Sequence, residues 1–198
     1  MSKHRAAVSL PEDRDGFRFR GGSAAIDLAA TLQARLKPAP RELLAAPVDL
    51  DRWLVSAGLV KSSPGAAEAD LATARALREA IFVLAGGLGG AALDADARDV
   101  LNRIAAAPAA APVLRADGSV AMDGSVAGLL SFLAREAVHL FGGENAAHIR
   151  QCQSSTCTIF FVDTSRSGDR RWCSMSACGN KAKVAEFRRR KRESPSGT

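Results

Sequence analysis

The sequence lacks any long apolar run of the kind that crosses or enters a membrane. No stretch of about 18 apolar residues occurs among its 198 residues, so a transmembrane helix is not expected. Residues 1–20 are polar and charged and contain no apolar stretch of signal-peptide length. We therefore expect a cytoplasmic protein that has no membrane partner.

The sequence patterns of common catalytic sites are also missing. We find no Ser/His/Asp set, no paired-carboxylate arrangement and no phosphate-binding glycine loop with its Lys-Ser/Thr pair. The glycine-rich segment 86–90 follows a predicted helix and lacks that pair, so we interpret it as a flexible connection. His139 lies on a strongly apolar predicted helix, and we expect it to be a packed histidine. These absences favour a protein that is not an enzyme.

Cysteine is absent before Cys152, and four cysteines then fall within 27 residues. A disulfide framework needs an oxidising compartment, and the C-x-x-C spacing of dithiol redox sites is missing. Zinc is redox-inert and accepts four sulfur ligands, so mirrored C-x4-C pairs favour a tetrahedral Zn²⁺ site. A redox site is the next alternative, and an iron–sulfur cluster ranks below it. His148 is expected to lie beside the site or on the surface. The predicted zinc ligands are Cys152, Cys157, Cys173 and Cys178.

Positive charge is concentrated at the C-terminal end of the chain. From Arg150 onward there are 11 Lys/Arg and 4 Asp/Glu, a net charge of +7, whereas residues 1–149 carry 16 basic and 17 acidic residues. Such asymmetry is typical of a segment that binds a polyanion. A solvated tail that only aids solubility would have the same composition, so charge alone leaves both interpretations open.

Hydrophobic periodicity predicts an α+β protein in two parts. Residues 17–145 are expected to form a mostly helical domain with one small β-hairpin around Asp117-Gly118, and 146–193 a small zinc module, with 1–16 and 194–198 flexible. The predicted helices are 23–36, 49–57, 66–85, 93–107 and 125–141, and the hairpin strands are 112–116 and 119–123. Trp53 should anchor the second helix. The predicted core is Leu77, Ile81, Leu84, Leu130, Leu133, Ala137 and Leu140.

The zinc module is predicted to contain two strands and one basic helix. Residues 158–162 alternate like a strand, Arg171-Trp172 are expected to return as its partner, and Ser174 is a good N-cap for a helix over 175–192. The aromatic residues Phe160 and Phe161 have two possible roles. They either stack on single-stranded bases or pack under the zinc site.

Two motifs around the last cysteines resemble the CGNR zinc-finger family. These are Trp172-Cys173-Ser174-Met175 and Cys178-Gly179-Asn180-Lys181, supported upstream by 161–166 and by Arg170-Arg171. Lys181 stands where the family motif has Arg, which keeps the charge and loses the bidentate guanidinium fork.

The N-terminal part resembles the ABATE domain that usually precedes this finger. The residues that carry the resemblance are Gly21-Gly22, 25–28, Arg35, Leu50, Trp53-Leu54 and Gly58-Leu59. Together the two resemblances imply a treble-clef-like four-cysteine module after a helical domain, in a family described as stress-induced transcription regulators.

The helix after Cys178 supports a nucleic-acid-binding function. Lys181, Arg188 and Arg192 recur at spacings of seven and four, so they line one stripe that can neutralise phosphates. Asn180 is placed either to read adenine in a major groove or to bond locally near the helix start. The other candidate contacts, on the helix and the finger loop, are Arg166, Arg170, Arg171, Lys183 and Arg189, with Arg190 and Lys191 widening the stripe.

Four functions remain open on the sequence alone. The first is a DNA-binding transcription regulator whose helical domain senses a small molecule or a partner. The second is an RNA-binding module, and the third is a protein-interaction module in which zinc is only structural. The fourth is an enzyme with its site in the helical domain. Salt-dependent binding to duplex DNA, single strands and RNA separates the first three.

Overall fold

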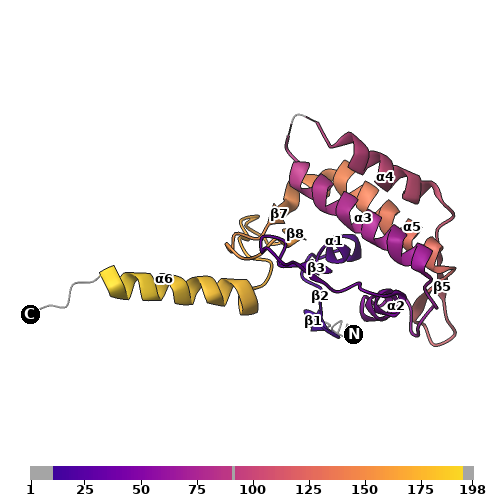
Figure 1. Cartoon of the computed structure of the whole chain (residues 1–198), viewed down its shortest axis with the longest axis horizontal. Helices are drawn as coiled ribbons and strands as arrows, with labels where there is room; N and C mark the ends of the chain where they lie inside the picture. The colour runs from indigo at the N-terminus through magenta and orange to yellow at the C-terminus, as the bar shows by residue number, and fades with distance from the viewer. Residues whose placement is uncertain (1–10, 91, 194–198) are drawn as a thin grey trace, which may run out of the picture.

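The computed structural model describes residues 11–90 and 92–193, and it shows a helical body from which one helix projects (Figure 1). About half of the chain is helical and the strands are short, so the protein is α+β as the sequence predicts. The α-helices are α1 (Ala24–Ala29), α2 (Pro47–Ser56), α3 (Glu68–Gly87), α4 (Ala95–Ala106), α5 (Val126–Gly142) and α6 (Asn180–Glu193).

Helices α3, α4 and α5 pack side by side and form the centre of the body (Figure 1). Their apolar residues recur at helical spacing, so each helix presents one side to the shared core. Helix α1 packs against α3 and α5, and α2 against α3, where Trp53 is fully buried. The predicted core residues Leu77, Ile81, Leu84, Leu130, Leu133 and Ala137 are all buried together, whereas Leu140 is only partly buried at its edge.

Local capping signals explain where several helices begin. The side chains of Asp94 and Ser125 accept hydrogen bonds from backbone N–H groups in the first turns of α4 and α5. Helix α2 begins two residues earlier than predicted, with Pro47 in its first turn, and Asp49 accepts the N–H of Ala46. Helix α3 continues through Gly86-Gly87, which were expected to lie just beyond its end.

Within the described residues, the strands form four antiparallel pairs and no larger sheet. The predicted hairpin is present as β5 and β6, with Gly118 at a positive φ of 76° in its turn. Three further pairs were not predicted as such. The pairs are β1 (Asp13–Arg14) with β2 (Phe17–Arg18), β3 (Leu32–Gln33) with β4 (Arg41–Glu42), β5 (Ala111–Leu114) with β6 (Val120–Asp123), and β7 (Ile149–Gln151) with β8 (Phe160–Val162).

The helix predicted over 23–36 is wrong in its second half. Helix α1 ends at Ala29, and the chain turns into β3, which pairs with β4. Thr31 donates its hydroxyl to the carbonyl of Leu28, and Ala34 has a positive φ of 55°, so the backbone leaves the helical path. Leu36, predicted to face inward, is 69% exposed.

Two other sequence expectations are corrected by the structure. His139 points to solvent rather than packing in the core. Residues 1–16 were expected to be flexible, but Asp13–Arg14 pair with β2, and Asp13 binds the guanidinium of Arg20 at 2.6 Å. Residues 1–10 and 194–198 lie outside the described residues. In the described part, no helix is long and apolar enough to cross a membrane.

The zinc module packs against the helical body. Phe160 of β8 belongs to the main core and meets Phe82 of α3 edge-on, with ring centroids 5.4 Å apart. The N–H of Val162 donates to the carbonyl of Gly21 at 2.8 Å. Conversely, Ala30 from the end of α1 lies in the small core that contains the cysteines. The seam between the two parts is therefore a packed interface that orients the module.

A buried carboxylate shapes the chain just before α1. Asp27 is 6% exposed, and its Oδ1 accepts the N–H groups of Arg20 at 2.8 Å and Gly21 at 2.7 Å. Burial raises the pKa of Asp27 to about 7, although these two hydrogen bonds oppose the change. The two hydrogen bonds thus stabilise the carboxylate form of Asp27, whereas its burial destabilises that form.

The first prediction concerns the central helix. Leu133 is fully buried, so Leu133→Ala should lower the free energy of unfolding by about 2–5 kcal/mol. The control is Leu36→Ala, which should cost less than about 0.5 kcal/mol because Leu36 is exposed. Denaturant unfolding of both variants measures the difference, and equal costs would mean that α5 is misplaced.

The second prediction concerns Asp27. Its folded pKa is about 7 and its unfolded value is near 3.8, so the folded state binds more protons between these values. Stability should therefore fall as pH rises, by about 1 kcal/mol between pH 6 and pH 8. In Asp27→Asn that decline should disappear, because the amide does not titrate, while its oxygen still accepts both N–H groups. An unchanged pH dependence in the variant would contradict the assignment.

Candidate metal centre and basic helix

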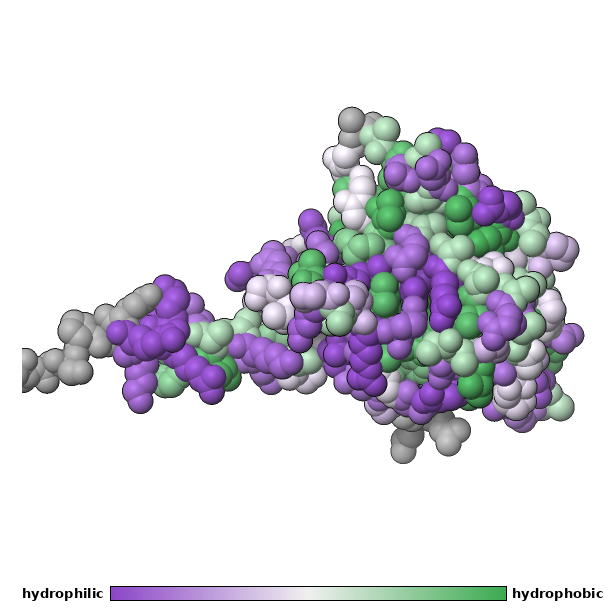
Figure 2. All heavy atoms as spheres, viewed as in Figure 1, coloured by the Kyte–Doolittle hydropathy of each residue, from purple (hydrophilic) through white to green (hydrophobic). Residues whose placement is uncertain are grey.

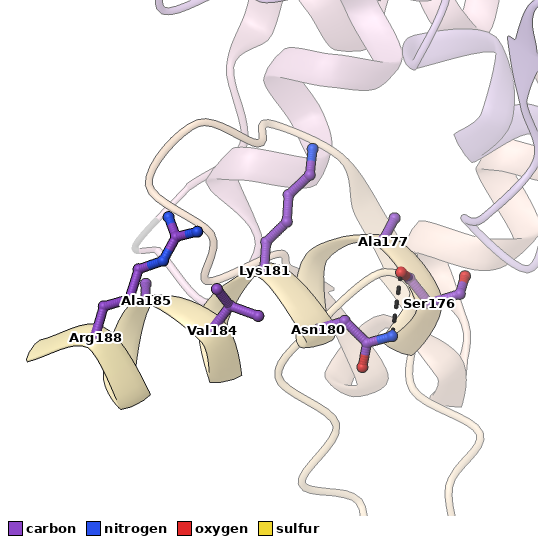
Figure 3. Close-up of a pocket in the computed structure, with 7 residues that line it drawn as sticks. All are labelled: Ser176, Ala177, Asn180, Lys181, Val184, Ala185 and Arg188. Atoms are coloured by element: carbon purple, nitrogen blue, oxygen red, sulfur yellow. Dashed lines mark hydrogen bonds between the residues drawn. The ribbon is translucent and has the colours of Figure 1, made fainter. Parts of the chain in front are cut away.

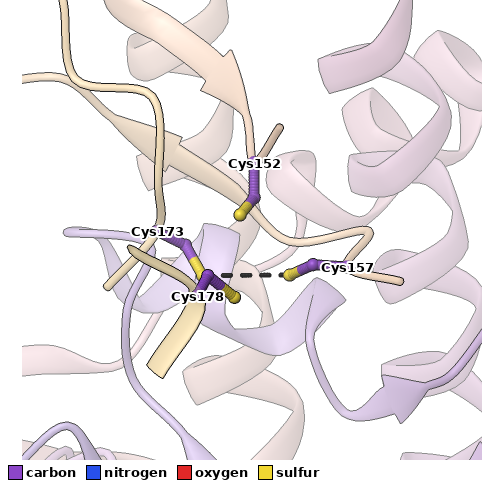
Figure 4. Close-up of side chains that lie close together, drawn as sticks. All are labelled: Cys152, Cys157, Cys173 and Cys178. Atoms are coloured by element: carbon purple, nitrogen blue, oxygen red, sulfur yellow. Dashed lines mark hydrogen bonds between the residues drawn. The ribbon is translucent and has the colours of Figure 1, made fainter. Parts of the chain in front are cut away.

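The four cysteine side chains converge on one point between the zinc module's two halves (Figure 4). Cys152 directly follows β7, Cys157 lies in the loop before β8, and Cys178 lies on the π-helical turn η2 (Met175–Gly179), which leads into α6. All four Sγ atoms lie within 4.8 Å of one another. The Sγ atoms of Cys157 and Cys178 each lie 3.8 Å from that of Cys173.

This geometry fits a tetrahedral zinc site. Zn–S bonds of about 2.3 Å place tetrahedral sulfurs roughly 3.8 Å apart, which matches the Cys157–Cys173 and Cys173–Cys178 separations. The cysteines are free thiols, since a disulfide would bring two sulfurs to about 2.05 Å. Zn²⁺ is the cofactor of this module. The four thiolates are the groups that would hold it, and the metal would supply structural cross-linking rather than an open catalytic position.

The electrostatics of the four thiols also favour a cation. A hydrogen bond from Cys173 lowers the pKa of the Cys157 thiol to about 5. The same hydrogen bond raises the pKa of Cys173, and burial together with the neighbouring thiols raises that of Cys178 to about 11. A bound divalent cation would lower the pKa of Cys173 and Cys178 and stabilise both as thiolates.

The second half of the site is built by a tight turn at the start of the basic helix. Ser174 Oγ accepts the N–H of Ala177, and the carbonyl of Ser174 accepts the N–H of Gly179 at 2.9 Å. A Cβ at Gly179 would lie 2.6 Å from Met175 Sδ and 3.2 Å from Trp172, so a larger residue would displace the exposed Met175 side chain. The glycine of the Cys-Gly-Asn-Lys motif thus lets the chain pass close to its own preceding loop.

The aromatic pair beneath the site is buried. Phe161 is fully buried among the cysteines and Phe160 reaches the main core, so neither ring is available to stack on bases. The partner of the predicted strand also differs from expectation. Strand β8 pairs with β7, whereas the carbonyl of Arg171 accepts the N–H of Gln153. Because β8 pairs with β7, the segment around Arg171 is not a strand of that pair, and it leads directly to Cys173.

The arginines of the finger loop have different surroundings. Arg170 is half-buried, and its guanidinium donates to the carbonyls of Trp172 and Cys173, so it supports the metal site. Arg171 is exposed, donates to Gln153 at 2.7 Å and lies over the Trp172 ring. Arg166 is exposed on the loop. The loop therefore offers Arg166 and Arg171 to a partner, while Arg170 is already used inside the module.

The basic residues of α6 are exposed on a helix that projects from the body. Lys181 and Arg188 extend from the same side of α6, and Asn180 turns back to the carbonyl of Ser176 at 3.4 Å (Figure 3). Arg192 continues that stripe by helical spacing, and Arg189 beside it pairs with Glu186 at 2.7 Å. Lys183 was expected to widen the stripe, but it lies about 200° around the helix from Lys181.

Other cations close to the zinc module come from the helical domain and were missed in the sequence. Arg18, Lys37 and Arg41 line a cleft that also contains Cys157, Cys178 and Lys181. They are isolated basic residues in segments more than 100 positions before the cysteines, so no local pattern connects them. Only the packing of the module against β2 and the β3–β4 region brings them together.

The third prediction is the metal content and its role. Purified protein should contain about one Zn²⁺ per chain, and Cys157→Ser or a strong chelator should unfold the module, because bound zinc supplies most of so small a unit's folding free energy. Emission from the half-buried Trp172 should change, while buried Trp53 should keep the signal of a folded helical domain.

Elemental analysis and tryptophan fluorescence measure the two results. Trp172→Phe is the matched control that assigns the change in emission to the module. Some loss of stability in the helical body is also expected, because Phe160 contributes to its core. Protein that contains no zinc, or in which Cys152 and Cys157 form a disulfide, would contradict the site.

Comparison with known protein families agrees with this architecture. Residues 22–144 match the ABATE family, described as "Putative stress-induced transcription regulator", and residues 148–191 match the CGNR zinc finger. A search of curated proteins gave no match. The first match covers more than half of the chain, and the second contains all four cysteines and most of the basic helix. The chain therefore belongs to the ABATE family and carries a CGNR zinc finger at its C-terminal end.

Proposed function

We propose that the protein is a DNA-binding transcription regulator whose zinc module presents α6 to the duplex. The observation that carries the proposal is that α6 combines an ordered start with a high positive charge. Residues 180–193 contain seven Lys/Arg and two Glu, a net charge of +5. Figure 2 shows hydrophilic side chains gathered over this projecting helix and over the region where it leaves the body.

The zinc site supports this function by fixing the beginning of the helix. Cys178 lies two residues before α6, so a metal bound there ties the helix start to β7 and to the loop before β8. Side chains on an ordered helix lose less conformational entropy when they contact successive phosphates than those of a disordered tail would. Helix α6 is about 20 Å long and narrow enough to approach a major groove about 12 Å wide.

Contacts from this surface are expected to be mostly to phosphates. Lys181, Arg188 and Arg192 form the central stripe, and Arg166 and Arg171 of the finger loop are further exposed cations of the module. Lys181 offers a point charge rather than a guanidinium fork, which suits a phosphate better than bidentate reading of a base. Asn180 is held by the carbonyl of Ser176, so base reading by this side chain would require that bond to break.

The other functions have less support. Binding of single-stranded RNA by stacking loses its two candidate rings, because Phe160 and Phe161 are buried. Catalysis has no residue set to carry it among the described side chains, since the clustered thiols are structural ligands. We propose that the protein acts by binding and that the helical domain responds to a small molecule or a partner. A protein-interaction role is the alternative, because Val184 and Phe187 are exposed on α6.

The fourth prediction tests the basic stripe. If about four phosphates are neutralised, log K for duplex DNA should fall against log salt with a slope of about −3 to −4. Arg188→Ala with Arg192→Ala should make that slope shallower by up to about two units, with little change in sequence preference. The control is Arg103→Ala with Arg115→Ala, two exposed arginines in α4 and the hairpin loop.

Binding isotherms over a salt series on duplex DNA, single strands and RNA give these slopes. Tighter binding to RNA than to duplex DNA would mean that RNA is the target. Asn180→Ala tests base reading separately, since that role requires altered specificity at one position of the site. If the double variant binds like the parent at every salt concentration, the stripe is not the binding surface and the protein-interaction function takes its place.

A further inference from the structure

A cleft of about 310 Å³ lies at the seam between the helical domain and the zinc module. One wall comes from β2 and the β3–β4 region, with Arg18, Lys37 and Arg41. The other comes from the module, with Thr156 near Cys157 and Lys181 at the start of α6. Its volume falls at the lower end of the range for small-ligand sites, which is about 300–1,000 Å³.

Apart from the zinc ligands Cys157 and Cys178, the ionisable side chains that line this cleft are all cationic. Arg18, Lys37, Arg41 and Lys181 line it without an ion pair to any carboxylate among the described residues, and no acidic side chain contributes to its lining. Cations gathered on facing walls repel one another, and the repulsion is relieved when an anion binds between them. The acidic residues of the N-terminal hairpin, Glu12 and Asp13, are instead engaged by Arg20.

A buried donor adds a second observation. The side chain of Arg20, another residue of the lining, is 8% exposed, and its Nε has no hydrogen-bond partner in the described part of the chain. This Nε lies 3.6 Å from Glu12 Oε2 in a long ion pair, and Nη2 binds Asp13 at 2.6 Å. Arg20 thus adds a further cation to the lining, with part of its charge balanced by these two carboxylates. The hydroxyl group of Thr156 adds a neutral donor on the opposite wall.

We propose that this cleft binds a phosphate group and thereby joins the helical domain to the start of α6. The phosphate belongs either to a free phosphorylated small molecule or to the backbone of a bound nucleic acid. A second groove, of about 550 Å³, shares Thr156 and Lys181 with the cleft and follows α6 to Arg189 and Arg192. A phosphate in the cleft therefore contacts Lys181, which also belongs to the basic stripe. If the phosphate belongs to DNA, the proposal rests on the proposed function. If it belongs to a free small molecule, the proposal is independent of that function.

The test compares the parent protein with Lys37→Ala/Arg41→Ala, whose changes lie on exposed side chains outside the zinc site. Arg103→Ala/Arg115→Ala is the matched control that removes two cations elsewhere. All three proteins are first checked for equal zinc content and equal unfolding temperature. Calorimetric titrations use inorganic phosphate and a nucleoside monophosphate at ionic strength held constant with chloride, and a duplex DNA salt series is recorded in parallel.

Binding of either small phosphate that weakens about tenfold or more in the cleft variant, but not in the control, supports the site with a free ligand. No small-phosphate binding, with a duplex salt slope shallower by about one to two units in the cleft variant only, supports it with nucleic acid. Equal behaviour of the cleft variant and control in both titrations overturns the proposal. The result for Arg188 and Arg192 is separate, so failure of the cleft and failure of the basic stripe are distinguishable.

Discussion

The convergence of four thiols is the constraint on which the rest of the C-terminal structure depends. Cys152 and Cys157 lie in the segment between β7 and β8, Cys178 lies on the turn that leads into α6, and Cys173 lies just before that turn. With only small strands and a core of a few side chains, this segment has little apolar surface to bury, so cross-linking by zinc must replace a hydrophobic core. Arg170 serves the same need, since its guanidinium donates to the carbonyls of Trp172 and Cys173 and so holds the segment that carries Cys173.

The seam between the two parts converts this local cross-link into an oriented module. Phe160 inserts into the core of the helical body, Ala30 enters the cysteine core, and Val162 bonds to Gly21. Each part therefore buries a side chain in the core of the other, so both cores depend on the interface. The direction in which α6 projects therefore depends on the helical domain. A domain that senses a ligand could act on a distant helix through such an interface, provided that the interface has two arrangements.

The distribution of positive charge around the zinc module also depends on how the two parts pack together. Helix α6 alone carries a net charge of +5, which suffices for attraction to a polyanion. The cleft adds Arg18, Lys37 and Arg41 from a domain whose overall charge is near zero. Net charge per segment thus conceals a local cationic site. Placing Lys181 in both the stripe and the cleft gives one residue through which a bound phosphate and a bound duplex would influence each other.

The sequence by itself determined the features that depend on short-range patterns. Mirrored cysteine spacing indicated the zinc module, apolar residues at helical spacing indicated α3, α4 and α5 with most of their core, and Ser174 marked the start of the basic helix. Each of these signals lies within a few turns of the chain.

Only the tertiary structure decided the rest. Leu32–Gln33 left its predicted helix to pair with β4, β8 took β7 as partner, and Phe161 was buried. The cleft unites residues more than 100 positions apart. These pairings and burials depend on which distant segments bury apolar surface against one another. A local sequence pattern does not identify that distant segment.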